Sequence, residues 1–350
     1  TADQLNKAVQ FQGMQLAGQQ IAGVGQSITS GVMGALQGAS REAVTLETAM
    51  AEVSKVTGLQ GAPLGQLQET LVKLSSTSIP STAAELAEIA AAGGSLGVAT
   101  GDLSQFVDVM SQMSVAFGMS TGDTGQKIGE VANGFKMLNP LTGKLDFKRV
   151  QTYGNVVNYL ADTMATSEAK IINSMQRMTG NAMYGFTENN LSSIAAAMTS
   201  LGIAPEVAAT SLNTTVAKLA TATTASEGAQ EAFAALGFDV TKLQDGMTSE
   251  KGMETFTAFI RKVSSMGARA GPHLSKALGL EASDEIARLA GSLPLLEKAM
   301  TSAENSIAGK GSTIADSLKI MGGTSAAQSK LMQNAIVALQ LKVGAVFDKI

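Results

Sequence analysis

The segment Ser81–Val98, STAAELAEIAAAGGSLGV, constrains the fold most, because it describes one short helix with its own start, packing face and stop. Thr82 is followed three residues later by Glu85, which fits a capping box in which each side chain satisfies a backbone amide at the helix start. The alanines leave one face low enough for another helix to approach closely. Gly93 is predicted to end the helix in the left-handed conformation, which costs glycine little.

The same pattern returns at Leu191–Leu219, where Gly202 is predicted to end one helix and Pro205 to start the next. Elsewhere apolar residues recur every three or four positions, and no convincing strand alternation is present. The sequence therefore predicts an all-α, multi-helical domain of short packed helix hairpins with Gly and Pro turns. Longer N- and C-terminal helices are predicted to flank it. The uneven unit lengths do not support a solenoid of fixed period.

Several helix limits follow from turn residues. Pro63 and Thr248 are each expected to open a helix, and Asn139–Phe147 is expected to form turns that close a small hairpin. Another helix is expected to start at about Gly125. The final helix is predicted over Ser325–Ile350, with an apolar face made of Leu331, Leu339, Val343 and Val346.

The composition favours many thin helices packed closely. Hydrophobic residues make up 45% of the 350 residues, but aromatic residues only 4%, and the chain has 18 Met and no Trp. Charged residues are 15%, below the roughly 25% of ordinary soluble domains. A surface so poor in charge favours self-association or coverage by a partner. The chain has no Cys, which excludes disulfides, and its scattered Lys and Arg do not form the basic patch of a nucleic-acid-binding protein.

Four motifs occur in the order found in phage tail tape measure proteins, and the chain resembles the core domain of that family over roughly Val44–Gly291. The motifs are ETAMAEVSKVTG (Glu47–Gly58), ELAEIAAAGG (Glu85–Gly94), LGIAPEVAATSLNTTV (Leu201–Val216) and AFAALGFDV (Ala232–Val240).

The resemblance implies a structural virion protein of the tail lumen or tip, assembled in the bacterial cytoplasm. Such a core docks at the tail tip or initiator and helps to determine tail length and deliver the genome. The implied partners are further copies of itself, as a trimer or hexamer, the tail tube, baseplate hub or distal tail proteins, and tail assembly chaperones. Contact with the host membrane on ejection is a further implication. No sequence-specific nucleic-acid partner is expected.

Three regions are expected: an N-terminal helix rich in Gly and Gln (1–42), the all-α core (43–310) and a C-terminal amphipathic helix (311–350). The chain is expected to continue beyond both ends. Ala8–Ser40 contains no charged residue and seven glycines. It is interpreted either as a helix ordered only within an oligomer or as a segment that enters a membrane when the tail fires. The second interpretation leaves a pore-forming helical protein as the alternative function.

The stretch 81–130 is strongly acidic. It is interpreted either as an ordinary solvated face or as an acidic surface on which a tail partner docks. Its only basic residue is Lys127, and its acidic residues are Glu85, Glu88, Asp102, Asp108, Asp123 and Glu130.

The sequence does not contain a combination of residues that indicates a catalytic site. The only histidine, His273, is expected to be a surface or capping residue, and with no Cys a zinc site is not indicated. Gly309–Thr313, GKGST, lacks the upstream Gly and the Ser or Thr after Lys of a phosphate-binding loop. Asp284 and Glu285 resemble helix-start charges. No catalytic, cofactor-binding or metal-binding residue is therefore assigned, and no cofactor and no enzymatic activity are expected.

Overall fold

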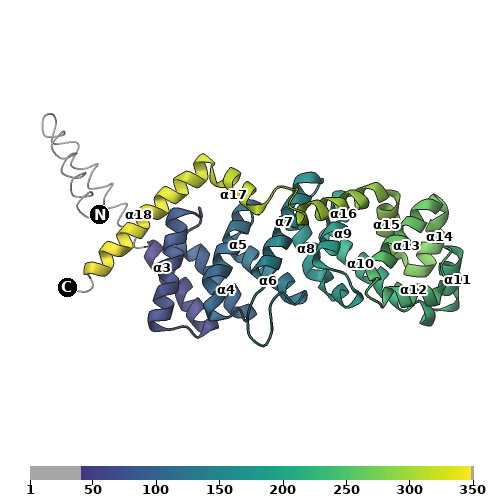
Figure 1. Ribbon diagram of the computed structural model, residues 1–350, viewed down its shortest axis with the longest axis horizontal. Coiled ribbons are helices and arrows are strands. Elements are labelled where there is room, and N and C mark those ends of the chain that lie inside the picture. The colour runs from purple at the N-terminus through teal and green to yellow at the C-terminus, as the bar shows by residue number, and fades with distance from the viewer. Residues whose placement is uncertain (1–40, 348–350) are drawn as a thin grey trace.

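The structure is a computed structural model that describes residues 41–347. Within that range the only β structure is one isolated antiparallel bridge, between Leu138 and Leu145, and the all-α prediction is confirmed (Figure 1). The bridge closes the predicted hairpin. Residues 41–57 are helical and are followed by α3 (Gly61–Thr77), α4 (Ala83–Leu96), α5 (Leu103–Phe117), α6 (Thr121–Gly134), α7 (Phe147–Thr163), α8 (Glu168–Met178), α9 (Glu188–Ser200), α10 (Pro205–Ala220), α11 (Glu227–Ala235), α12 (Val240–Met247), α13 (Gly252–Met266), α14 (Gly271–Leu278), α15 (Leu280–Gly291), α16 (Leu293–Ile307), α17 (Ile314–Gly322) and α18 (Ser325–Phe347).

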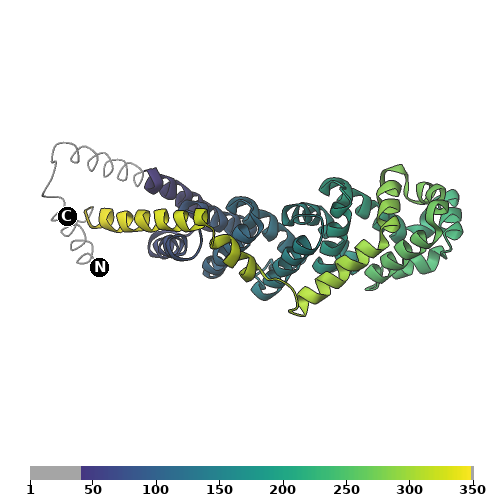
Figure 2. The same ribbon diagram turned by 90° about the horizontal axis from the view of Figure 1, so that it is seen from above.

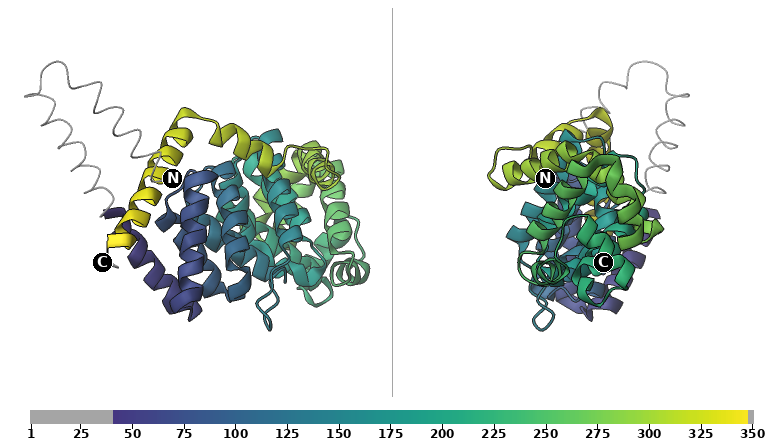
Figure 3. Two further views of the ribbon diagram at one scale, coloured as in Figure 1. Left: turned by 60° about the vertical axis from the view of Figure 1, so that its left-hand side comes forward. Right: turned by 90° about the vertical axis from the view of Figure 1, so that its right-hand side faces the viewer.

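The helices run out along an elongated body and then return. Helices α3 to α6 form one end, α7 to α10 the middle, and α11 to α15 the far end (Figure 1). The last three helices then retrace this path: α16 packs on α7 and α9, α17 on α5, and α18 on α3. Figure 3 shows yellow α17 and α18 along one edge of the purple-to-teal helices. The return helices thereby join segments that are far apart in the sequence.

Short-range capping signals were predicted well. Thr82 and Glu85 form the expected capping box at α4, and Pro205 occupies the first turn of α10. The Asp146 and Ser167 side chains accept hydrogen bonds from backbone amides at the starts of α7 and α8. Each cap contributes about 1 kcal/mol to helix stability. Gly202, which follows the C-cap residue Leu201 of α9, has a φ of 77°, as predicted.

The prediction for Gly93 is wrong. Helix α4 continues to Leu96 and ends at Gly97, whose φ is 86°. Gly93 instead lies where α4 meets α5, and a Cβ atom there would be 2.8 Å from the ring of Phe106. At Gly94 a Cβ atom would lie 2.9 Å from the side chain of Val56, in the helix of residues 41–57. These two glycines therefore permit close packing on both sides of α4 rather than ending it.

Other helix limits also differ from the predicted ones. α3 begins at Gly61, two residues before Pro63, and α6 begins at Thr121 rather than near Gly125. Thr248 ends α12 instead of opening α13, which begins at Gly252. The described part of the predicted C-terminal helix, residues 311–347, contains two helices, α17 and α18.

The predicted apolar face of α18 is wrong at Leu339, whereas Leu331 is half-buried, in keeping with the prediction. Leu339 is 54% exposed, whereas Asn334 and Ala338 are buried against the body. The side chains of Val343 and Val346 lie outside the described residues. The prediction assumed that the large aliphatic residues of this helix face inward. The body instead presents the backbone carbonyl groups of Ser75 and Ser81 to α18, and the side chain of Asn334 donates hydrogen bonds to them.

Candidate functional site

The helix of residues 41–57 and α18 lie next to each other at one end of the body (Figures 1 and 2). A small cavity of about 20 Å³ is lined by Leu46 from the first of these helices, Val72 from α3, Ala84 from α4, and Asn334 and Ala338 from α18. Four helices therefore meet there. The chain thus enters and leaves the described body at the same end, although these helices are separated by almost the whole described sequence.

Asn334 fixes this junction. Its side-chain nitrogen donates hydrogen bonds to the carbonyl oxygens of Ser75 (2.9 Å) and Ser81 (2.8 Å), and the residue is 7% exposed. Ser75 lies in the last turn of α3, where carbonyl groups have no partner within the helix. One buried amide therefore caps α3 and holds the connection from α3 to α4. Removing it would leave two buried carbonyl oxygens without these bonds.

A second contact between α18 and α4 is electrostatic. The Lys330 ammonium lies 3.0 and 3.1 Å from the two carboxylate oxygens of Glu85, which also accepts the backbone amide of Thr82. Both charged side chains are about 40% exposed, at 40% for Lys330 and 39% for Glu85. An ion pair this exposed contributes about 0–1 kcal/mol. It orients α18 more than it stabilises the body.

The connection from α16 to α17 is anchored on α7. Gly311 packs on the face of the Tyr159 ring, where a Cβ atom would lie 2.7 Å from the ring. Ser312 hydrogen-bonds the Asp162 carboxylate, and the backbone amide of Ile314 donates to the side-chain oxygen of Asn155 (2.9 Å). The segment Gly309–Thr313, which superficially resembles a phosphate-binding loop, is therefore the connection that holds α16 and α17 against α7.

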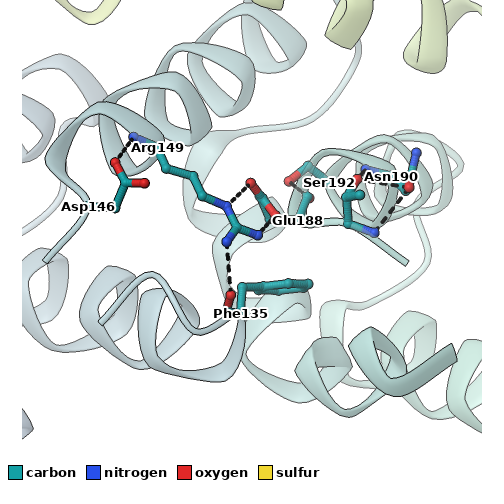
Figure 4. Close-up of polar contacts among 7 residues, drawn as sticks. Phe135, Asp146, Arg149, Glu188, Asn190 and Ser192 are labelled. Atoms are coloured by element: carbon teal, nitrogen blue, oxygen red, sulfur yellow. Dashed lines mark hydrogen bonds and ion pairs between the residues drawn. The ribbon is translucent and has the colours of Figure 1, made fainter. Parts of the chain in front are cut away.

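Among the ion pairs of residues 41–347, the most buried carboxylate belongs to Glu188 (Figure 4). Arg149 contacts it with both arms of its guanidinium, Nε to Oε1 at 2.8 Å and Nη2 to Oε2 at 2.6 Å. The third nitrogen, Nη1, donates to the carbonyl oxygen of Phe135 at the end of α6 (3.2 Å). The hydrogen bonds with Glu188 raise the pKa of Arg149 above its ordinary value. This cluster ties together α6, α7 and α9.

The surroundings of Glu188 favour a structural role. Glu188 is the first residue of α9, where a negative charge is stabilised by the helix dipole, and Arg149 places a positive charge at the end of α6. Tyr153 is fully buried nearby, and burial, followed by the charge of Glu188, raises its pKa. Its hydroxyl has no hydrogen-bond partner among the described residues. The cluster contains neither a histidine nor an activated nucleophile.

The residues considered for chemistry lie on three different helices. His273 is half-buried on α14, Glu85 caps α4, and Asp284 is exposed on α15. No hydrogen bond or ion pair joins His273 to an acidic residue in the range 41–347. Within the same range no group of three or more His, Asp or Glu side chains is placed to hold a metal ion.

A family model described as phage-related minor tail protein matches residues 68–279, which lie entirely within the described body. The chain belongs to this family. The minor tail protein is therefore a structural component of a phage tail and of the virion, and the resemblance noted in the sequence is confirmed at that level. No curated protein and no solved structure matched the chain.

Most acidic residues of the stretch 81–130 in this minor tail protein have partners within the chain. Glu85 contacts Lys330, and Glu88 accepts a hydrogen bond from Thr121 (3.1 Å). Asp123 lies 3.6 Å from Lys127, and Glu130 accepts hydrogen bonds from Gln126 and Gln176. These contacts favour the interpretation of an ordinary solvated face over that of an acidic docking surface.

No helix within residues 41–347 of the minor tail protein is both long enough and apolar enough to span a membrane. The two interpretations of Ala8–Ser40 concern residues outside the described range.

Two structural features were missed by the sequence analysis. Asn334 lies beside Gln333 within the largely apolar segment LMQNAIVALQ, and this interruption of the apolar pattern does not reveal which of the two amides is buried. The Arg149–Glu188 pair joins residues 39 apart and has no local pattern.

Proposed function

We propose that this minor tail protein is the core domain of a tape measure protein, which docks at the tail tip or assembly initiator and helps to set tail length and deliver the genome. The observation that carries the proposal is the family match over 68–279 within a body whose first and last helices emerge at one end. The ordered motifs between Val44 and Gly291 support the same assignment.

The arrangement supports a docking module rather than the ruler itself. A ruler must extend along the tail axis, and a continuous helix does so at about 1.5 Å per residue. The described body consists of short helices that run out and then return, so its ends are neighbours and its residue count does not translate into axial length. In this proposal the length is measured by helical sequence outside residues 41–347.

The proposed partners follow from a location on the tail axis. They are further copies of the chain, as a trimer or hexamer, together with the tail tube, the baseplate hub or distal tail proteins, and assembly chaperones. Assembly takes place in the host cytoplasm, and residues 1–40 are proposed to contact another copy or the host membrane during ejection. The chain acts by packing and docking, without a catalytic residue and without reading a nucleic-acid sequence.

The experiment substitutes His273 and Asp284 by Ala in the phage, singly and together. Tails should assemble at normal length, because neither side chain contributes to packing or docking in this proposal. Deletion of residues 1–40 should impair assembly or infection. Electron microscopy of tails and plaque counts measure both. Loss of infectivity from His273→Ala in a normally folded protein would contradict the proposal.

A further inference from the structure

Helix α18 is held to the body with little apolar burial. Among its described side chains, residues 325–341, only Asn334 and Ala338 are buried, at 7% and 8% exposure. Helix α16, which returns along the same path, buries Leu296, Ala299, Ser302 and Ala303. Hydrophobic stabilisation scales with the apolar area removed from water. The described part of α18 therefore gains less from burial than α16 does.

The contact between α18 and α3 is also incompletely filled. Beside the cavity at Asn334, a groove of about 770 Å³ lies between the two helices and is lined by Gly65, Gln68, Val72 and Ser76 of α3 and by Ala338 and Leu341 of α18. Side chains on the two sides of an open groove contact water rather than each other. The attachment therefore depends on the polar contacts of Asn334 and Lys330.

Water can replace these polar contacts when α18 leaves the body. The carbonyl groups of Ser75 and Ser81 and the amide of Asn334 would then bond water, and this exchange is why a hydrogen bond contributes much less to stability than its strength in isolation. The Lys330–Glu85 pair is about 40% exposed already, at 40% and 39%. Separation from the body is therefore a low-cost change for α18.

The connection to α17 allows α18 to move alone. Gly322 ends α17 and Gly323 follows it, and consecutive glycines permit a wide range of backbone conformations. The start of α17 is fixed, because Ile314 is buried and its backbone amide donates to Asn155 of α7. We propose that α18 is a strap that opens as a unit about Gly322–Gly323, while the rest of the described body stays folded.

Opening of the strap changes the surface at this end of the body. Leu46, Val72 and Ala84 line the cavity beneath α18 and become accessible, and the carbonyl groups of Ser75 and Ser81 become free to accept other donors. The helix of residues 41–57 lies beside α18, so the change occurs where the chain enters the described body (Figure 2). The opening depends only on these contacts and not on the proposed role in the tail.

Thiol labelling tests the opening directly, because the chain contains no cysteine. Ala338→Cys and, separately, Ser302→Cys are introduced into the full chain and treated with iodoacetamide. Ser302 is the matched control, since it is 7% exposed on α16. Ala338→Cys should react about ten times faster or more, with unchanged circular dichroism spectra, because only α18 opens without global unfolding. Equal rates at the two positions would overturn the strap.

A third cysteine variant tests the hinge. Ile314→Cys, at the buried start of α17, should react as slowly as Ser302→Cys, because α17 stays on the body when α18 opens. Labelling at position 314 as fast as at position 338 would overturn a hinge at Gly322–Gly323.

Further substitutions, each combined with Ala338→Cys, separate opening of the whole helix from fraying of its end. Lys330→Met acts on the side of Asn334 nearer the hinge and should raise the labelling rate about two- to fivefold, because it removes an exposed ion pair. Asn334→Ala should raise the rate about tenfold, because the closed state then leaves two carbonyl oxygens without these bonds. Gln333→Ala, at the exposed neighbouring position, should not change it. No response to Lys330→Met would mean that only the end of α18 frays, which overturns the proposal.

Discussion

Asn334 of α18 donates a hydrogen bond to the carbonyl oxygen of Ser75, a residue 259 positions earlier in the chain. This contact joins the last described helix to the end of α3. Because the same amide also holds Ser81, one side chain links the end of the chain's return path to its beginning. This buried amide and the Lys330–Glu85 pair together hold α18 on the body.

Asn334→Ala should destabilise the protein. The substitution leaves two buried carbonyl oxygens without these bonds, at a cost of about 1–3 kcal/mol in the free energy of unfolding. Gln333→Ala, at the exposed neighbouring position of the same helix, is the control and should change stability by less than about 0.5 kcal/mol. Denaturant unfolding measures both. Equal effects would show that Asn334 does not fasten α18.

Arg149→Met should cost more than the same change at an exposed pair. It removes charged hydrogen bonds from Glu188, whose side chain is 6% exposed, at about 1.5–3 kcal/mol. Arg261→Met is the matched control, because the Arg261–Glu297 pair is 57% and 46% exposed, and its loss should cost about 0–1 kcal/mol. Thermal unfolding measures the loss of stability in both variants. A larger loss for Arg261→Met than for Arg149→Met would contradict this account.

Tyr153 should make stability depend on pH above about 10, the ordinary pKa of tyrosine. Its pKa is raised by burial, so above that pH the unfolded chain loses the proton while the folded protein keeps it. Stability contributed by the neutral hydroxyl is present below this pH and falls as pH rises. Tyr153→Phe should therefore flatten the loss of unfolding free energy between pH 10 and 11. Identical slopes for variant and wild type would count against this.

Gly93 and Gly202 should respond differently to substitution. A side chain at Gly93 meets the buried ring of Phe106, whereas Gly202 has open space but a φ of 77°. Gly202→Ala should cost about 1–2 kcal/mol and Gly202→Asn less, because Asn tolerates the left-handed conformation. At Gly93, Asn should be at least as damaging as Ala, because it is larger. Rescue by Asn at both positions would restore the original interpretation of Gly93 as a helix stop.

Helix-start signals formed by residues close together in the sequence could be predicted from the sequence alone. Thr82 with Glu85 and Pro205 in α10 act within a few residues, so their patterns could be recognised without knowing the fold. Gly93 was assigned wrongly because its function depends on Phe106 in the next helix.

The long-range contacts had no such local pattern. Asn334 faces Ser75 only because α16 and α17 carry the chain back along the body, and the Arg149–Glu188 pair requires α7 and α9 to pack side by side. Leu339 is exposed on α18. It was assigned to the core because apolar residues were expected to face inward.

The most direct test of the proposed function is tail length after insertion. Adding 56 helical residues to the full-length protein outside residues 41–347 should lengthen the tail by about 84 Å, at about 1.5 Å per residue. The same insertion after Leu141, which is 93% exposed at the hairpin tip, should leave the length unchanged. Electron microscopy of purified tails measures both. Lengthening by the hairpin insertion, or none from the outside insertion, would contradict the assignment of this body as the docking core rather than the ruler.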